Sequence, residues 1–184
     1  MKISFERQRN LNEIQSCVNY NFKDIKLLNT SLTHSSYANE NKMRSYESNE
    51  RLEFLGDAIL NLIVSEYLYY HFSKLPEGEL TKKRATVVCE SSLAFAARKI
   101  NLGNYILLGK GEETTGGRNR DSLLADAFEA LIGAVYIDGG LTSTRTFLLG
   151  MFEEEVIYAI SKGNLFIDYK TELQEILQKR TKSK

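Results

Sequence analysis

The stretch N-E-R-L-E-F-L-G-D-A, residues 49–58, decides how this sequence is interpreted. On a helix of about 3.6 residues per turn, Glu53 and Asp57 are four positions apart and lie on one face. Glu50 falls on the same side, so three carboxylates project together. The spacing predicts a helix with an acidic face.

The rest of this predicted helix is apolar. The stripe opposite the carboxylates is expected to face the core, and it consists of Leu52, Leu55, Ile59 and Leu62. Farther along the helix, apolar residues also occupy the acidic side, at Leu60, Val64 and Leu68. A helix that is hydrophobic nearly all round is typical of a buried, central position.

A second acidic pair, Asp126 and Glu129, stands three positions apart in the segment A-D-A-F-E-A. Apolar residues surround it on another predicted helix, and residues 121–140 contain no Lys or Arg. Because burying a carboxylate without a counter-charge is costly, these groups are expected to face a water-filled cleft or to bind a cation. Oxygen ligands favour Mg²⁺, for which Mn²⁺ can substitute. The alternative is a set of ordinary acids on solvated helix faces.

Other kinds of site are excluded by their residue patterns. A di-iron carboxylate bundle needs Glu-x-x-His pairs, and neither His34 nor His71 follows a Glu by three positions. Cys17 and Cys89 have no C-x-x-C spacing, so we expect reduced thiols in a cytoplasmic protein rather than a zinc site. The Gly-rich segment near residue 116 lacks the phosphate-binding pattern of a P-loop, so no nucleotide cofactor is expected.

Charge is balanced over the 184 residues, with a formal net charge of zero, but it is unevenly distributed. Residues 121–140 carry only acids, whereas residues 74–99 and 170–184 carry an excess of bases. An acidic core with basic flanks fits an enzyme that holds metal ions and grips a polyanion, although solvated helix faces give the same pattern. No apolar run reaches about 18 residues, so we expect no membrane span.

Helical periodicity dominates, and the 42% of hydrophobic residues suffices for a core. An all-α domain with short connections is predicted. The predicted helices cover residues 10–18, 24–32, 48–71, 80–100, 122–137 and 142–160, with a seventh beginning near residue 169. Breaks are expected at residues 75–78, 109–117 and 138–140, and a domain boundary at residues 164–168.

Three residues do not suit a simple helix. Gly56 and Gly133 lie inside the two acidic helices, where each glycine costs up to about 1 kcal/mol relative to alanine. A close approach of two helices, or of a ligand, would explain them. Phe54 projects beside the acids and away from the core stripe, so it needs a second apolar partner. Another subunit and a neighbouring helix of the same chain both remain open.

These motifs resemble the ribonuclease III family. Residues 49–58 resemble the family's signature segment, and L-G-K-G-E-E-T-T-G-G-R-N-R-D-S-L-L-A-D-A-F-E-A-L-I-G-A-V-Y-I-D-G-G, residues 108–140, resembles its second block. L-T-H-S-S-Y, residues 32–37, resembles a third. The likeness predicts that residues 1–165 form a ribonuclease III-like helical endonuclease domain. The segment D-Y-K-T-E-L-Q-E-I-L-Q-K resembles the opening helix of a double-stranded RNA-binding domain, so residues 166–184 are predicted to be a linker and a remnant of that helix.

The resemblance implies a homodimeric, Mg²⁺-dependent endonuclease that processes double-stranded RNA, ribosomal RNA precursors included. Metal-activated water would cut each strand and leave 5′-phosphate and 3′-hydroxyl ends with short 3′ overhangs. By motif match, Glu53, Asp126 and Glu129 would be the main metal ligands. Asp57 would complete the shell directly or through water, and Asp57 and Glu129 would be catalytic.

The same resemblance assigns the dimer contact. Phe54 would insert into a socket of the partner subunit, and Glu50 and Glu77 would lie near the cleft and the dimer contact. Basic residues would meet RNA phosphates, and a loop at residues 116–117 would order on RNA. The expected phosphate contacts, each of which could instead be a solvated surface charge, are Lys82, Lys83, Arg84, Lys110, Arg118 and Arg120.

Two other classes of function remain open. A catalytically silent module could bind structured RNA, but the presence of all four carboxylates argues against it. A helical dimerisation protein with solvated acids is disfavoured by the basic flanks and by the specific second block.

Overall fold

The computed structural model describes residues 3–162 of the chain, with side chains through Met151. These residues are almost entirely helical, and their only β pairing is one isolated parallel bridge between Thr33 and Leu107. The predicted all-α class is therefore confirmed. The α-helices are α1 (Phe5–Val18), α2 (Ile25–Ser31), α3 (Ser35–Glu40), α4 (Glu50–His71), α5 (Glu77–Val87), α6 (Glu90–Lys99), α7 (Lys110–Thr114) and α8 (Asp121–Lys162). Short 3-10 turns are η1 (Ser45–Glu47), η2 (Leu102–Tyr105) and η3 (Gly117–Asn119).

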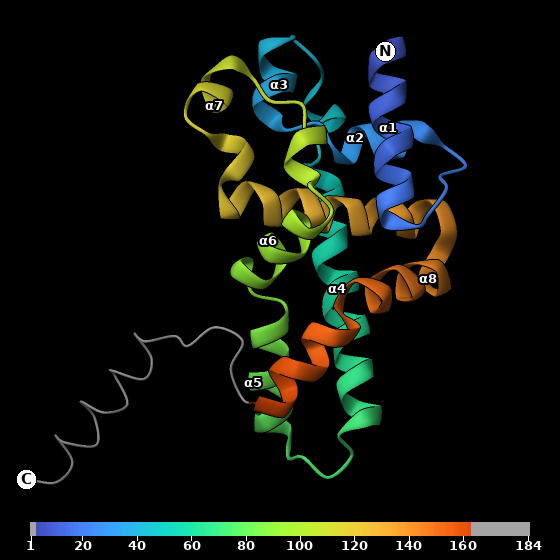
Figure 1. Cartoon of the computed structure of the whole chain (residues 1–184), viewed down its shortest axis with the longest axis vertical. Helices are drawn as coiled ribbons and strands as arrows, with labels where there is room; N and C mark the ends of the chain where they lie inside the picture. Colours follow the sequence, from blue (N-terminus) through green and yellow to red (C-terminus); the bar gives the residue numbers. More distant parts are fainter. Residues whose placement is uncertain (1–2, 163–184) are drawn as a thin grey trace, which may run out of the picture.

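The two longest helices, α4 and α8, form the centre of the molecule. They share the most extensive contact of any helix pair, and Figure 1 shows the first part of α8 crossing α4. Phe128 and Leu131 of α8 and Leu60 of α4 are completely buried between the surrounding helices. The remaining helices pack around this crossing, which places the two acidic segments at the heart of the fold.

The prediction that α4 is buried nearly all round was only partly correct. Leu52, Ile59 and Leu60 are buried as expected. The prediction that Leu62 belongs to the core-facing stripe was wrong, because its side chain is 51% exposed. Phe54, which lies outside that stripe, is 81% exposed as well.

Helix α8 bends at Gly140, as the predicted break at residues 138–140 indicated. Gly140 has φ 74° and ψ 179°, a conformation that residues with a Cβ rarely adopt. The Asp138 carboxylate fixes the preceding turn by accepting hydrogen bonds from the backbone N–H groups of Lys23 (3.0 Å) and Asp24 (2.9 Å). It also accepts one from the Tyr20 hydroxyl (2.7 Å). The bend is thus tied to the chain between α1 and α2.

Some predicted boundaries were wrong. The single helix over residues 80–100 is two helices, α5 and α6, because Cys89 adopts an extended conformation (φ −73°, ψ 155°). The first helix starts at Phe5 rather than at residue 10, because the Ser4 hydroxyl accepts a hydrogen bond from the backbone of Arg7 (3.1 Å). Helix α3 was not predicted, and α7 forms where a break was expected.

The predicted domain boundary at residues 164–168 and the helix near residue 169 lie outside the described residues. The division into residues 1–165 and 166–184 therefore remains a prediction. Among the helices of the described chain, none combines the length and the apolar character that crossing a bilayer requires.

Candidate active site

The acidic segments meet because the backbones of α4 and α8 touch at two glycines. A Cβ atom on Gly56 would lie 1.8 Å from the carbonyl oxygen of Glu129, and one on Gly133 would lie 2.3 Å from the carbonyl oxygen of Leu52. Any larger residue at either position would force the helices apart. The two unexpected glycines are thus explained by close helix approach, one of the two explanations that the sequence left open.

This crossing gathers three of the four predicted carboxylates. Glu53, Asp126 and Glu129 each offer an oxygen atom, and these oxygens all lie within 4.8 Å of one another. All three side chains are half-buried. The arrangement joins residues more than 70 positions apart in the sequence into one cluster, which we call the carboxylate cluster.

Asp57, the fourth predicted carboxylate, lies one turn after Glu53 but is exposed and is not part of the carboxylate cluster. Its Oδ1 atom accepts a hydrogen bond from Nδ2 of Asn61 (2.8 Å). Asn61 was not singled out from the sequence, although the spacing of four residues on a helix is a signal for such a side-chain pair.

The carboxylate cluster is strongly repulsive. Burial raises the pKa of Glu129 to about 8, and charge repulsion from three neighbours contributes, in decreasing order, from Asp57, Glu53 and Asp126. Burial also raises the pKa of Glu53, with further contributions from Asp126, Glu50 and Asp57. Among the described residues, no ion pair involves a member of the carboxylate cluster. A bound cation would relieve this repulsion.

The pKa of Asp126 is also affected by charged or polar residues on two other helices. Burial raises the pKa of Asp126, the charge of Glu90 raises it further, and His34 acts in the opposite direction. Glu90 opens α6 and His34 caps the start of α3, so the electrostatic surroundings include helices that the sequence did not associate with the site.

The donor set fits a hard divalent cation. Three carboxylates converge, and no ion pair among the described residues involves any of them. Mg²⁺ binds through carboxylate oxygens and water, whereas zinc and iron sites favour sulfur or imidazole ligands. Glu53, Asp126 and Glu129 are therefore the residues that could hold a metal ion.

Two of the three predicted dimer residues, Phe54 and Glu50, line a groove of about 720 Å³. Phe54 is 81% exposed, which rules out the alternative that it packs against a neighbouring helix of the described chain. Glu50 lies in the same groove and accepts a hydrogen bond from the Ser48 hydroxyl (3.2 Å). The apolar part of the groove is lined by Leu27, Leu52, Leu55 and Ile137. Glu77 is elsewhere, at the start of α5, where it accepts a hydrogen bond from Thr81 (2.8 Å).

The side chains of the three predicted RNA contacts on α5 make different contacts within the chain. Lys82 is largely exposed and pairs with Glu79 (3.3 Å), and Lys83 lies over the ring of Phe72. Arg84 is held against α4, where Nη1 donates to the Ser65 hydroxyl (3.0 Å).

The three predicted RNA contacts in residues 110–120 are paired with acids. Lys110 is highly exposed and lies 3.8 Å from Glu40. Arg120 pairs with Glu112 (2.9 Å), and Arg118 donates to both carboxylate oxygens of Glu113 (2.6 Å each). These pairs flank residues 116–117, for which a loop that orders on RNA remains a prediction.

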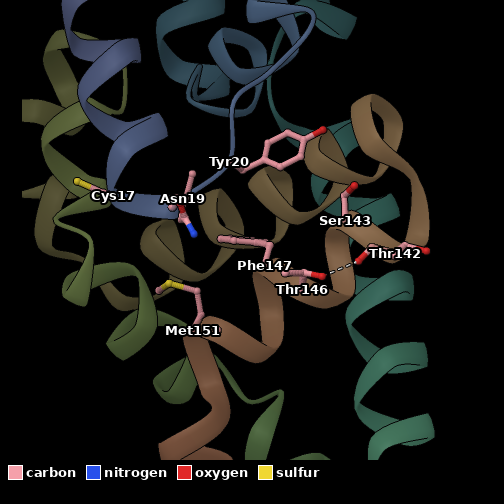
Figure 2. A pocket seen from close by; sticks show the side chains of 10 residues that line it. Cys17, Asn19, Tyr20, Thr142, Ser143, Thr146, Phe147 and Met151 are labelled. Atoms are coloured by element: carbon pink, nitrogen blue, oxygen red, sulfur yellow. Dashed lines mark hydrogen bonds between the residues drawn. The ribbon is translucent and has the colours of Figure 1, made fainter.

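A second cavity, of about 390 Å³, lies between the end of α1 and the part of α8 beyond Gly140. Figure 2 shows Cys17 and Asn19 on the α1 side and Thr146, Phe147 and Met151 on the α8 side. Among the residues with described side chains, no charged one lines this cavity, and none of its lining residues belongs to the carboxylate cluster. It therefore adds nothing to the acidic site.

Comparison with known proteins points to one family. Residues 24–155 match the Ribonuclease-III-like family model. The chain is 55% identical over 168 residues to Ribonuclease 3 of Caldanaerobacter subterraneus subsp. tengcongensis, which covers 91% of this chain and 73% of that protein. It is 50% identical over 178 residues to Ribonuclease 3 of Clostridium acetobutylicum, which covers 97% of this chain and 76% of that protein.

Solved structures agree as well. The nuclease domain of ribonuclease III from Campylobacter jejuni superposes with a TM-score of 0.73 at 44% identity, over 78% of this chain and 96% of that chain. The published description of that structure refers to a flexible region involved in dimer formation. Together with the family match over most of the described chain, this similarity shows that the chain belongs to the ribonuclease III family.

Proposed function

We propose that this chain is an endoribonuclease that hydrolyses double-stranded RNA at the carboxylate cluster, in RNA processing that includes the maturation of ribosomal RNA. The observation that carries the proposal is the convergence of Glu53, Asp126 and Glu129 at a glycine-lined helix crossing. The relatives named Ribonuclease 3 support the reaction class.

Mg²⁺ is the proposed cofactor, with Mn²⁺ as a substitute, held by Glu53, Asp126 and Glu129. A divalent cation, when bound, supplies the Lewis acidity that activates water and neutralises the charge of the phosphodiester. Asp57 adds negative charge at the edge of the carboxylate cluster. The chain itself needs no nucleophilic side chain, and breaking the P–O3′ bond leaves a 5′ phosphate and a 3′ hydroxyl.

The two helices hold the carboxylates before any substrate arrives. Gly56 and Gly133 place the two acidic turns in contact, and neither turn can move without disturbing the core around Phe128. Such preorganisation is what electrostatic catalysis requires, because no reorganisation is needed during the reaction.

A homodimer is the proposed assembly. Phe54 is exposed beside an apolar groove of its own subunit, and a two-fold axis would bring the same groove of a partner to it. Such a dimer would present two carboxylate clusters to one duplex and would cut both strands, which leaves short 3′ overhangs. Glu50, at the same groove, and Glu77, on α5, are the further acidic residues proposed near the cleft and the dimer contact.

RNA would be held mainly through its phosphates, since the deep, narrow major groove of an RNA duplex hides the bases. Among the proposed contacts, Lys82 and Lys110 are exposed lysines that each lie near one acid, and Lys83 lies over the ring of Phe72. Arg84, Arg118 and Arg120 would have to exchange existing partners for phosphate. Cleavage should therefore fall steeply as salt rises.

The test is cleavage of an end-labelled RNA duplex in Mg²⁺ at low salt. Glu129→Gln should reduce the rate about a thousandfold, about 4 kcal/mol of transition-state stabilisation, because it removes a proposed metal ligand. Glu6→Gln, on the exposed first turn of α1, is the matched control and should retain wild-type activity. Metal binding and RNA binding without any cleavage by the wild-type chain would favour a silent RNA-binding module instead.

A further inference from the structure

The side chain of Asp57 is held by Asn61, a residue that has no role in the proposed reaction. Asn61 lies one turn farther along α4, and its Nδ2 group donates to Oδ1 of Asp57 (2.8 Å) and to the Asp57 carbonyl oxygen (3.0 Å). Both partner atoms are acceptors, so the amide nitrogen of Asn61 must face them. Its two hydrogens are thus committed to one residue.

The turn of α4 that carries Asn61 is tied to a second helix. The Ser65 hydroxyl donates to the backbone carbonyl oxygen of Asn61 (2.6 Å) and accepts a hydrogen bond from Nη1 of Arg84 (3.0 Å). Arg84 belongs to α5, so these bonds anchor the backbone at Asn61, while the side-chain amide of Asn61 is held by its two bonds to Asp57.

The hydrogen bond from Asn61 restricts the side chain of Asp57. Asp57 is exposed and lies outside the carboxylate cluster, so without a partner its side chain could rotate into solvent. Asp57 lies one helical turn after Glu53, on the same face of α4. Only Oδ1 accepts from Asn61, so Oδ2 remains available toward a bound cation or its water.

We infer that Asn61 is a positioning residue that holds the Asp57 carboxylate at the edge of the carboxylate cluster, where its charge acts on a divalent cation. This inference rests on the proposed function. Asn61 touches neither substrate nor metal and acts only through Asp57. Residues that orient a metal site from outside its ligands change metal affinity or activity about 10–100-fold when they are replaced.

The test compares Asn61→Ala with Asn61→Gln. Alanine removes the amide but favours the helix, whereas glutamine keeps an amide that can reach an acidic residue four positions earlier. Asn12→Ala on α1 is the matched control, because the Asn12 amide also takes part in a side-chain hydrogen bond across one helical turn, in which its Oδ1 accepts from Nε2 of Gln8 (3.1 Å). Circular dichroism establishes that each variant is folded.

Two readouts separate positioning from stability. Mn²⁺ binding without RNA is measured by electron paramagnetic resonance, and the Mg²⁺ concentration for half-maximal cleavage is measured at saturating RNA. Asn61→Ala should bind Mn²⁺ about tenfold more weakly and need about tenfold more Mg²⁺, with an unchanged KM for RNA. Asn61→Gln should stay within about threefold of the wild type, and Asn12→Ala should match it.

Other results would overturn the inference. If Asn61→Ala and Asn61→Gln bind Mn²⁺ alike, whether as wild type or equally weakly, the amide does not position Asp57. A lower melting temperature with unchanged metal dependence would show a purely structural role. If the wild-type chain neither binds Mn²⁺ nor cleaves RNA, the proposed function fails as well. If it does both and Asn61→Ala matches it, only the role of Asn61 fails.

Discussion

The helix crossing and the segment of residues 110–120 differ in how their charged side chains are arranged: like charges cluster at the crossing, and opposite charges pair in the segment. At the crossing, Glu53, Asp126 and Glu129 are packed together with no ion-pair partner among the described residues. In the segment, Arg118 and Arg120 are each paired with an acid a few residues away. Contact between buried backbones can hold like charges together, whereas an exposed segment folds by cancelling its own charges. The acids are therefore ready for a cation, and the arginines must change partners to meet a phosphate.

The largest effect is expected from breaking the crossing itself. Gly56→Ala places a Cβ atom 1.8 Å from the carbonyl oxygen of Glu129, which no side-chain rotation can relieve. We expect the free energy of unfolding, measured with urea, to fall by about 3 kcal/mol or more. Gly78→Ala in α5 is the control, because its Cβ atom meets nothing within 4 Å, and it should gain up to about 1 kcal/mol. Equal stability of the two variants would refute the proposed close contact.

A smaller loss is expected from the charged segment. Arg118 donates through Nη1 to the carbonyl oxygens of Gly103 (2.7 Å) and Ile106 (2.9 Å), in addition to its pair with Glu113. Arg118→Ala should cost about 2 kcal/mol of unfolding free energy, since charge-assisted bonds to part-buried carbonyls are lost.

Arg120→Ala is the comparison for that variant. Arg120 is itself exposed and contacts only side chains, those of half-buried Glu112 and exposed Thr115, so its loss should cost about 1 kcal/mol, less than that of Arg118. If the two arginine variants lose the same stability in urea, the bonds of Arg118 to the carbonyls do not matter.

The smallest expected effect is a pH-dependent change in melting temperature that arises from repulsion among the acids of the carboxylate cluster. The pKa of Glu129 is raised from 4.5 to about 8 in the folded chain, so folding favours its protonated form. The associated stability is complete below about pH 4.5 and is lost as the pH rises through about 8. In a chelator, Glu129→Gln should therefore melt a few degrees above the wild type at pH 8.5 and close to it at pH 4.5. Scanning calorimetry at the two pH values measures this, and a pH-independent difference would contradict it.

The three members of the carboxylate cluster could be singled out from the sequence because each acidic pair lies one helical turn apart on a strongly apolar helix, whereas Asp57 of the first pair lies outside the cluster. The same pattern allowed α4 to be placed to within two residues at its start. It failed at Leu62, because periodicity shows which side of a helix is apolar but not whether another element covers that side.

Other features depended on tertiary contacts and could not be predicted. The break before α6 follows from an extended Cys89 inside an otherwise helical pattern, and α7 forms where glycines indicated a loop. Glu90 affects Asp126 only because α6 packs against α8. The crossing could be anticipated from Gly56 and Gly133, but only the structure shows that each glycine faces the other helix's backbone.

The most direct test of the account is the position of a bound metal ion. Crystals of the chain grown with Mn²⁺ should show an anomalous diffraction peak at the carboxylate cluster, with oxygens of Glu53, Asp126 and Glu129 at about 2.1 Å. A peak at that place would establish the crossing of α4 and α8 as a metal centre. Saturating Mn²⁺ with no peak there, or with a peak only at other acids, would contradict the central claim.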